Sequence, residues 1–259
     1  MNEIQVATLN LRNRQDRWLS RRKLVVAELL DSRPDLISLQ EVYLPIGQAR
    51  WLRNQINSRI SGNSSGPYHL VQKRRQNFLK GYFEGLAILS KLPVLAHDSV
   101  DLGYGGRIAL RANIELPSRQ TLDFVAVHFH HKAEDREARL EQAMRLTGWL
   151  QDQNPAPIQI VAGDFNETPD GPAIQHMKSS YRSAFVEARG YEPVATFPTA
   201  LVTQSNGWSG CLDYIFISKT NGQITDAQIF CRKPAPEDPR LYPSDHVGLL
   251  ANIQYDSKM

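Results

Sequence analysis

The sequence predicts a layered α/β sandwich, in which two β-sheets pack face to face and helices cover the outside. Two observations predict this architecture. Short apolar runs of strand length recur along the chain, and only a few segments have apolar side chains at helical spacing. No internal repeat, low-complexity tract or Pro/Gly-rich linker divides the 259 residues. Mixed strands with few helices favour two packed sheets, so we expect residues 1–259 to form one domain.

The first third of the chain alternates strands and helices. Residues 16–30 have apolar side chains at helical spacing, with Arg21 and its two basic neighbours on the outer side. Pro34 ends this helix, because proline cannot continue the helical hydrogen-bond ladder. A Gly/Ser-rich turn at 61–67 closes the second helix. We expect strands at 4–11, 35–42, 68–72 and 85–90, and helices at 16–30 and 48–60.

The rest of the chain is richer in strands. Residues 133–151 form the strongest predicted helix, with apolar side chains on one side and Glu/Arg pairs outside. The run 158–162, apolar except for Gln159, predicts a buried strand. We expect strands at 108–116, 121–128, 158–162, 211–218, 224–231 and 247–254, and helices at 133–151 and 172–177.

The composition is that of an ordinary globular protein, with 41% hydrophobic and 22% charged residues. The net charge of +3 is compatible with a polyanionic ligand but too small to indicate one by itself. Cys211 and Cys231 are either one disulfide or, as is typical of a reducing compartment, two reduced and partly buried thiols. The chain shows no signal peptide and no run of ~20 apolar residues that could cross a bilayer. We expect a cytoplasmic protein without a transmembrane segment, and the sequence indicates no protein partner.

Two polar motifs adjoin apolar runs and give the strongest indication of chemistry. Residues 163–166 (Gly-Asp-Phe-Asn) follow a buried strand, and residues 244–246 (Ser-Asp-His) precede another. A rigid strand end can hold an oxygen ligand for a divalent metal, with a histidine beside it. Asp164 can orient or activate a water and Asn166 can donate to a phosphoryl oxygen, whereas the ordinary alternative is an Asp/Asn turn. The pair indicates metal-assisted hydrolysis of a phosphate ester.

Asn10 and Glu41 also lie near the ends of predicted strands. A carboxylate with a neighbouring amide suits Mg²⁺, which keeps most of its waters, and Mn²⁺ could substitute for it. Taken singly, Asn10 is ordinary as a turn residue and Glu41 as a surface charge. Their combination with Asp245 is what suggests a metal site.

Asp213 lies inside a strand of apolar and aromatic residues. A buried carboxylate needs a partner, because it otherwise loses several kcal/mol of solvation. His246 is available as that partner. His246, held by Asp213, would then contact the scissile phosphate.

His128 ends the strand 121–128 and begins a run with three histidines in four positions. Strand alternation would place His128 and His130 on one face and permit a two-histidine zinc site. The other candidate ligands are oxygen donors, which disfavours zinc, and His130 and His131 are interpreted as loop residues near the substrate. Glu84 is either a charge at a strand edge or the group that orients His128.

Seven segments, taken in order, resemble the endonuclease/exonuclease/phosphatase superfamily, which includes deoxyribonuclease I. They are Thr8-Leu9-Asn10, Leu39-Gln40-Glu41-Val42, Glu84-Gly85-x-Ala87-Ile88, Val127-His128, Gly163-Asp164-Phe165-Asn166, Leu212-Asp213-Tyr214-Ile215 and Ser244-Asp245-His246-x-x-Leu249. The resemblance covers nearly the whole chain, and a Trp18-x-x-Arg21 segment is similar to small bacterial stand-alone members. It implies a four-layer α/β/β/α sandwich, one catalytic domain, and in-line attack of water on phosphorus.

The resemblance also implies a role for each candidate position. One Mg²⁺ would lie among three oxygen ligands, two groups would position the water and the phosphoryl group, and two histidines with their acidic partners would bracket the phosphate. The metal ligands are Asn10, Glu41 and Asp245, and the catalytic residues are Glu84, His128, Asp164, Asn166, Asp213 and His246.

Two substrate classes stay open. A nuclease-like phosphodiesterase is suggested by the basic stretch 73–80, which could follow a phosphate backbone, although a solvated loop explains it equally well. The alternative is a phosphatase or phosphodiesterase for a small-molecule or lipid head-group phosphate, sphingomyelinase- or inositol-phosphatase-like. Its apolar pocket would be lined by Tyr104, Phe129, Phe197 and Trp208. A binding module without activity is disfavoured, because no candidate position carries an incapable residue.

Overall fold

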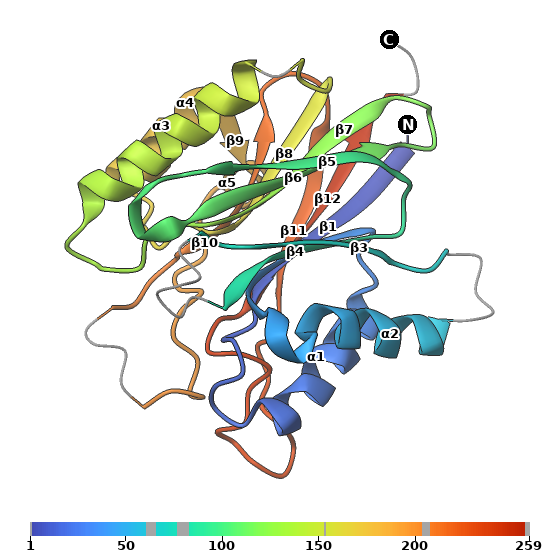
Figure 1. The fold of residues 1–259 in the computed structure, drawn as a ribbon, viewed down its shortest axis with the longest axis vertical. Helices are drawn as coiled ribbons and strands as arrows, with labels where there is room; N and C mark the ends of the chain where they lie inside the picture. The colour runs from blue at the N-terminus through green and yellow to red at the C-terminus, as the bar shows by residue number, and fades with distance from the viewer. Residues whose placement is uncertain (1, 61–65, 77–82, 153, 204–207, 257–259) are drawn as a thin grey trace.

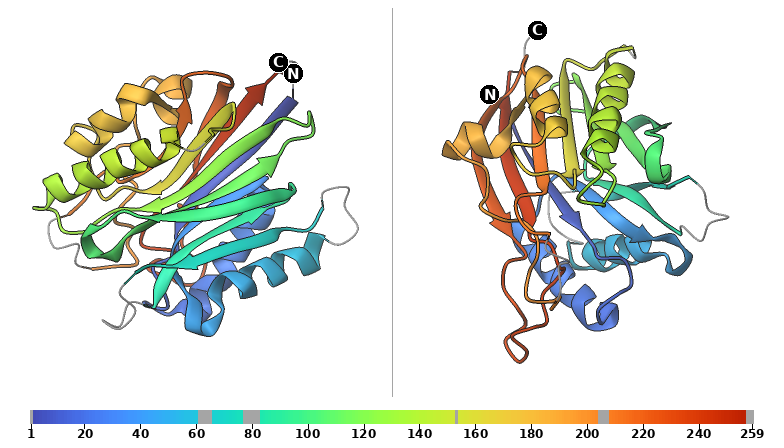
Figure 2. Two further views of the ribbon diagram at one scale, coloured as in Figure 1. Left: turned by 45° about the horizontal axis from the view of Figure 1, so that its top comes forward. Right: turned by 90° about the vertical axis from the view of Figure 1, so that its left-hand side faces the viewer.

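The computed structural model describes residues 2–60, 66–76, 83–152, 154–203 and 208–256. Two six-stranded sheets pack face to face (Figures 1 and 2). The first sheet has the order β11 (Gln223–Phe230), β12 (Gly248–Tyr255), β1 (Asn2–Asn10), β2 (Leu36–Tyr43), β4 (Glu84–Ser90) and β3 (His69–Arg74). The second has the order β5 (Val94–Asp101), β6 (Ile108–Glu115), β7 (Thr121–His128), β8 (Ile158–Asp164), β10 (Asp213–Ser218) and β9 (Tyr181–Ser183).

Helices cover the outer face of each sheet, and Figure 1 shows the two helix pairs on opposite sides of the molecule. The first sheet carries α1 (Trp18–Ser32) and α2 (Gln48–Ile60), and the second carries α3 (Arg136–Asp152) and α4 (Pro172–Ser180). The short α5 (Ala184–Arg189) lies against β10 and β11. Two 3₁₀ turns are η1 (Leu44–Ile46) and η3 (Tyr104–Gly106). The predicted α/β/β/α sandwich is confirmed.

The central strands, among them β4, β7, β8 and β10, are buried on both faces, which explains their largely apolar sequences. In β1, Ile4 and Val6 face the opposite sheet, whereas Ala7 and Leu9 face the helices. In β8, Ile160 and Ala162 lie between the sheets, whereas Val161 faces the helices. Three apolar cores result, one between the sheets and one beneath each helix pair.

Each sheet contains one parallel pair of strands, β1–β2 in the first sheet and β7–β8 in the second, while the other neighbours are antiparallel. An outer helix connects the members of each parallel pair, because parallel strands need a long crossover. The two sheets therefore share one pattern of pairings, although the sequence shows no repeat. Parallel neighbours end at the same edge, so two pairs of strand ends are available to form a site.

All predicted strands and helices are present, with ends shifted by a few residues. Three elements were not predicted: β5, β9 and α5. The side chains of β5 are half-buried or exposed, because it is an edge strand and lacks the apolar alternation of the others. The strand β9 has only three residues, too few to give a pattern.

The prediction that Arg21 points outward is wrong. Arg21 is fully buried, and its guanidinium donates to the carbonyls of Gln15 at 2.7 Å, Asp16 at 2.8 Å and Pro243 at 2.8 Å. The loop after β1 folds back over the start of α1, with four non-glycine residues of the segment 12–17 at positive φ. Its carbonyls have no strand partners there, and Arg21 supplies the donors that they require.

Both cysteines are free and buried, so no disulfide joins them. Among the helices in the described ranges, none is long and apolar enough to span a membrane.

Candidate active site

The predicted site residues come together where the two parallel strand pairs end. Asn10 ends β1 and Glu41 lies near the end of β2, while His128 and Asp164 end β7 and β8 and are paired in register. Asp213 begins β10 directly opposite Asp164. Glu41, His128 and Asp164 line a pocket of about 670 Å³. Its wall also includes Glu84, Asn166, Asp245 and His246, whereas Asn10 and Asp213 are not part of it.

Two of these residues have an unusual backbone conformation. Glu41 has a φ of 51° and Asn166 a φ of 49°, and both lie in the left-handed region that costs a non-glycine residue about 1 kcal/mol or more. The pairing of β2 with β4 is irregular between Leu39 and Val42, which is where Glu41 leaves the strand pattern. Such conformations persist where the surrounding structure holds a side chain in a required direction.

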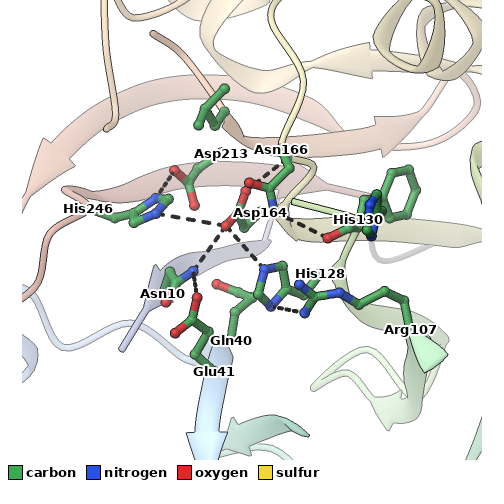
Figure 3. Close-up of polar contacts among 12 residues, drawn as sticks. Asn10, Gln40, Glu41, Arg107, His128, His130, Asp164, Asn166, Asp213 and His246 are labelled. Atoms are coloured by element: carbon green, nitrogen blue, oxygen red, sulfur yellow. Dashed lines mark hydrogen bonds and ion pairs between the residues drawn. The ribbon is translucent and has the colours of Figure 1, made fainter. Parts of the chain in front are cut away.

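Asp164 is the centre of the site (Figure 3). Its Oδ2 accepts a hydrogen bond from Asn10 Nδ2 at 3.0 Å, and its Oδ1 accepts one from the Asn166 backbone N–H at 2.8 Å. The same Oδ2 lies 3.5 Å from Nε2 of His128 and 3.8 Å from Nε2 of His246. Burial, and then the charge of Asp213, raise the pKa of Asp164 to about 6. A carboxylate with this pKa can accept a proton near neutral pH.

His246 is held by Asp213. Its Nδ1 lies 2.8 Å from Oδ2 of Asp213, so the second ring nitrogen, Nε2, faces Asp164 and the pocket. Burial lowers the pKa of His246, but the carboxylates of Asp213, Asp164 and Asp245 outweigh it and raise the pKa to about 10. The three carboxylates therefore favour the protonated, cationic form of His246. The partnership predicted for Asp213 and His246 is present.

The chemistry of the donors fits a hard divalent cation. The carboxylates of Glu41, Glu84 and Asp245 face one another, and burial, then Glu84 and Asp245, raise the pKa of Glu41 to about 7. A bound cation would relieve this repulsion, and oxygen ligands suit Mg²⁺. Asn10 turns Nδ2 toward Glu41 at 3.3 Å, while its Oδ1 accepts from the backbone of Arg12 and keeps a second lone pair.

A second group could also hold an ion. Ligand atoms of Asp164, Asp213 and His246 lie within 4.8 Å of one another. The 2.8 Å separation between Asp213 and His246 is that of a hydrogen bond. These three residues can therefore exchange protons, whereas the oxygen-rich set suits a hard metal ion.

The direct contact expected between Glu84 and His128 is replaced by a relay. Arg107 lies between them, with Nη1 at 2.8 Å from Nδ1 of His128 and 3.6 Å from Oε1 of Glu84. Glu84 also pairs with Arg75 and accepts from Asn13. The Glu84 carboxylate is surrounded by Arg75, Arg107 and Asn13 and therefore acts on His128 only through Arg107.

Comparisons with known proteins identify the family. The model of the endonuclease/exonuclease/phosphatase family matches residues 7–246. The chain belongs to this family. It is therefore an enzyme of the phosphoester hydrolase class. No curated protein sequence gives a significant match.

Solved structures of the endonuclease/exonuclease/phosphatase fold agree with this chain over nearly their whole length. A family member from Bacteroides vulgatus is 21% identical with a TM-score of 0.73, and 99% of this chain and 100% of that one are covered. The human Nocturnin catalytic domain with a bound sulfate anion is 19% identical with a TM-score of 0.74, covering 98% and 95%. Truncated TDP2 from Caenorhabditis elegans is 18% identical with a TM-score of 0.77, covering 98% of each chain.

Three arginines of this endonuclease/exonuclease/phosphatase member line the pocket: Arg12, Arg75 and Arg107. Arg75 belongs to the basic stretch 73–80 that was expected near the substrate, whereas Arg12 and Arg107 were not predicted. Arg12 lies 3.2 Å from Oδ2 of Asp245. Sequence offered one weak signal, the position of Arg107 between a Gly-Gly pair and a predicted strand. An isolated arginine is otherwise typical of a solvated surface.

Arg139, another buried arginine, supports the part of the pocket rim formed by residues 131–133. Arg139 pairs with Glu167 at 3.2 Å, both side chains being fully buried, and it donates to the carbonyls of Lys132 and, at 3.0 Å, Ala133. His131 and Lys132 line the pocket beside these carbonyls. Arg139 thus holds this rim much as Arg21 holds the loop of Arg12.

The remaining histidine and aromatic predictions separate into two groups. His130 bonds Asp135 through Nε2 at 2.8 Å, and with Nδ1 of His128 given to Arg107, the two do not form a zinc pair. Phe197 and Trp208 line the pocket as expected. Phe129 is instead a core residue, and Tyr104 packs on His130. Of the basic stretch 73–80, residues 77–80 lie outside the described residues.

Proposed function

We propose that this enzyme is a Mg²⁺-dependent, nuclease-like phosphodiesterase that hydrolyses its substrate by in-line attack of an activated water. The observation that carries the proposal is the position of Asp164. It is a buried carboxylate of raised pKa that is oriented by Asn10 and lies within 4 Å of the Nε2 atoms of His128 and His246. A base, a cationic acid and fixed donors therefore surround one small volume.

The catalytic residues of the chain have separate roles in the reaction. Asp164 accepts a proton from the attacking water, and Asn166, whose Nδ2 gives one hydrogen to the Phe129 carbonyl at 3.2 Å, has a second hydrogen for a phosphoryl oxygen. His246 donates its Nε2 proton to the leaving oxygen, and Asp213 stabilises the imidazolium before that transfer. General acid and base groups each contribute about 10²–10⁴-fold.

Mg²⁺, held by Glu41, Asp245 and Asn10, would supply positive charge against the negative charge that develops on the phosphoryl and leaving oxygens. Arg12 and Arg107 add fixed donors on the pocket wall. Guanidinium groups match phosphate in geometry as well as in charge.

The charge around the site favours a polyanionic substrate. A second hollow of about 640 Å³ shares Arg75 and Phe83 with the first pocket and is also lined by Lys73 and Arg74. A nucleic-acid strand could pass from one hollow to the other, with its phosphates beside these cations. The aromatic wall supports the alternative: Phe197 packs against His246 with ring centroids 4.8 Å apart, which would suit a small-molecule or lipid head-group phosphate.

Turnover assays with and without chelator test the proposal. Purified protein is given Mg²⁺ or Mn²⁺ and plasmid DNA, single-stranded RNA, bis-p-nitrophenyl phosphate, p-nitrophenyl phosphate or sphingomyelin. We expect metal-dependent cleavage of plasmid DNA, RNA and bis-p-nitrophenyl phosphate, with nucleic acid preferred at low salt. Turnover of the monoester or of sphingomyelin alone would favour the alternative, and no turnover of any phosphoester would overturn both.

Two substitutions test the assigned roles. We expect Asp164→Ala and His246→Ala each to lower kcat by about two decades or more. The matched controls are Asp31→Ala and His97→Ala, which change exposed residues of the same types and should leave kcat near the wild-type value. An active Asp164 or His246 variant would refute that residue's role.

We further infer that residues 1–259 make one catalytic domain that works in the cytoplasm. Strands β1 and β12 from opposite ends of the chain pair from Asn2 with Tyr255 to Thr8 with Leu249, and both free thiols are buried. A single unfolding transition and recovery in the cytosolic cell fraction are the expected results.

A further inference from the structure

His128 and His246, which both line the pocket, have different partners. His246 gives Nδ1 to a carboxylate, whereas His128 has Nδ1 at 2.8 Å from Nη1 of Arg107. Figure 3 shows the guanidinium at the far side of the His128 ring from Asp164. Both Arg107 and His128 are about 5% exposed, so the contact is shielded from water.

This contact fixes the position of the proton on His128. A guanidinium has five N–H donors and no acceptor, so Nδ1 of His128 must offer its lone pair. A neutral His128 then carries its proton on Nε2. A doubly protonated ring would place an N–H group against the N–H of Arg107 at 2.8 Å and bring two buried cations together.

The tautomer of His128 determines what this residue can do for the phosphodiesterase reaction proposed above, and the role assigned to it rests on that proposed function. We propose that Arg107 is a positioning residue that holds His128 as a neutral imidazole with its proton on Nε2, so that His128 serves as a hydrogen-bond donor to a phosphoryl oxygen. In this role His128 does not transfer a proton. Proton transfer belongs to Asp164 and His246 alone.

The surroundings of Arg107 support this role. Glu84 lies 3.6 Å from its Nη1 and is itself held by Arg75 and by Asn13, whose Nδ2 donates to Oε2 at 3.1 Å. Glu84 thereby keeps the Arg107 guanidinium charged and in place against the ring. The chain Asn13–Glu84–Arg107 acts on His128 only through its last member.

The Nε2 side of His128 is suited to donation. The distance of 3.5 Å to Asp164 Oδ2 is too long for a strong hydrogen bond, and the ring lines the pocket. Burial, then Arg107 and Arg75, and after them His246 and His131, hold the pKa of His128 well below its usual range. A phosphoryl oxygen in the pocket would find a neutral donor there beside the cation of His246.

Nitrogen-15 NMR of the metal-free protein tests the tautomer without any substrate. Long-range ¹H–¹⁵N correlation separates protonated from unprotonated ring nitrogens, and the His128→Asn spectrum assigns the signal. We expect His128 to show Nε2–H and a bare Nδ1 at neutral pH. A proton on Nδ1, or a doubly protonated ring, would overturn the proposal, and this result requires no Arg107 variant to fold.

Substitution of Arg107 supplies the second measurement. Arg107→Met should let the Nδ1–H tautomer appear and bring the titration of His128 closer to the ordinary value of about 6.5, whereas Arg107→Lys should restore the wild-type pattern. Arg111→Met is the control and should leave His128 unchanged, because Arg111 lies in β6, which begins just after Arg107, and is paired with Asp98. A folded Arg107→Met protein with the wild-type His128 signals would refute the role of Arg107.

Kinetic measurements distinguish a hydrogen-bond donor from a general acid at position 128. Asparagine retains a neutral N–H donor, so His128→Asn should lose about tenfold in kcat and His128→Ala about 10²–10³, the cost of a lost transition-state donor. At His246 both substitutions should be equally damaging. Equal losses for Asn and Ala at His128 would contradict the donor role, while absence of all phosphoester turnover would contradict the proposed function and leave the NMR result standing.

Discussion

Replacement of Arg21 by methionine should destabilise the protein strongly, although α1 lies outside the sheets. The side chain is fully buried and makes four short hydrogen bonds from one charged group. They reach the carbonyls of Leu11 at 3.1 Å, Gln15 at 2.7 Å, Asp16 at 2.8 Å and Pro243 at 2.8 Å. Methionine fills a similar volume, so the loss is that of the donors rather than of packing.

The expected size follows from two opposing effects. Hydrogen bonds from a charged group contribute about 1.5–3 kcal/mol each. Burial lowers the pKa of Arg21 to about 10, which shows that much of this gain offsets the loss of hydration. We expect a net destabilisation of about 3 kcal/mol, or roughly 6–12 °C in the melting temperature at about 2–4 °C per kcal/mol for a chain of this size.

Thermal unfolding followed by circular dichroism measures the effect. Lys23→Met is the matched control, because Lys23 is exposed on the same helix and its loss changes the net charge equally. The free energy of unfolding of the control should lie within about 0.5 kcal/mol of the wild-type value. Arg21→Lys, with fewer donors and a different geometry, should fall between the two. Each kcal/mol of stability corresponds to about 2–4 °C in melting temperature. If Arg21→Met melts within about 2 °C of the control, the difference is about 1 kcal/mol or less, and the buried guanidinium does not hold the loop.

Three further predictions concern the site. Asp213→Asn removes a carboxylate that helps to raise the pKa of His246 to about 10. Activity needs protonated His246 and is lost as the pH rises through that pKa, so the alkaline limb of the kcat/KM profile should move to lower pH by about a unit or more. An unmoved limb would count against His246 as the acid. Gly163→Ala would place a Cβ 2.1 Å from a backbone oxygen of β7, so it should cost about 1–3 kcal/mol in thermal unfolding, whereas Gly148→Ala, with nothing within 4 Å, should be neutral or stabilising. Glu41→Gln should raise the melting temperature of the metal-free protein, because it removes the cost of burying a charge and the repulsion from the neighbouring carboxylates. It should also abolish the heat of Mg²⁺ binding in titration calorimetry. Undiminished binding would exclude Glu41 as a ligand.

The fold could be predicted because its signals are local. Strands buried on both faces leave continuous apolar runs, and the polar residues that interrupt them stand at the strand ends. Asn10, Asp164 and His246 were found for this reason. Edge strand β5 escaped because one exposed strand has no strong pattern, and its partner β6 specifies it through backbone hydrogen bonds.

The contacts of Arg107 and Arg21 could not be predicted, because they depend on residues distant in sequence. Arg107 meets a histidine 21 positions away, and Arg21 meets the carbonyl of Pro243 across 222 positions. Helical spacing placed Arg21 on the surface because it assumes that solvent lies beyond the helix face. A returning loop occupies that space instead.

The path of the chain between the sheets has a consequence for how new substrates could be accommodated. Among the strands that the structure describes, the chain crosses from one sheet to the other at residues 91–93 and 219–222. The pairings of Leu36 with Ser90 and of Ile217 with Ile160 place both crossings at the end opposite the pocket, and the pairing of Asn2 with Tyr255 lies at that end too. The sandwich is thus tied together at one end, while the loops at the other end connect strands within a sheet or lead to outer helices. Those loops could be lengthened, shortened or exchanged among relatives without disturbing the packing of the two sheets, and chain termini carrying fused proteins would stay clear of the pocket.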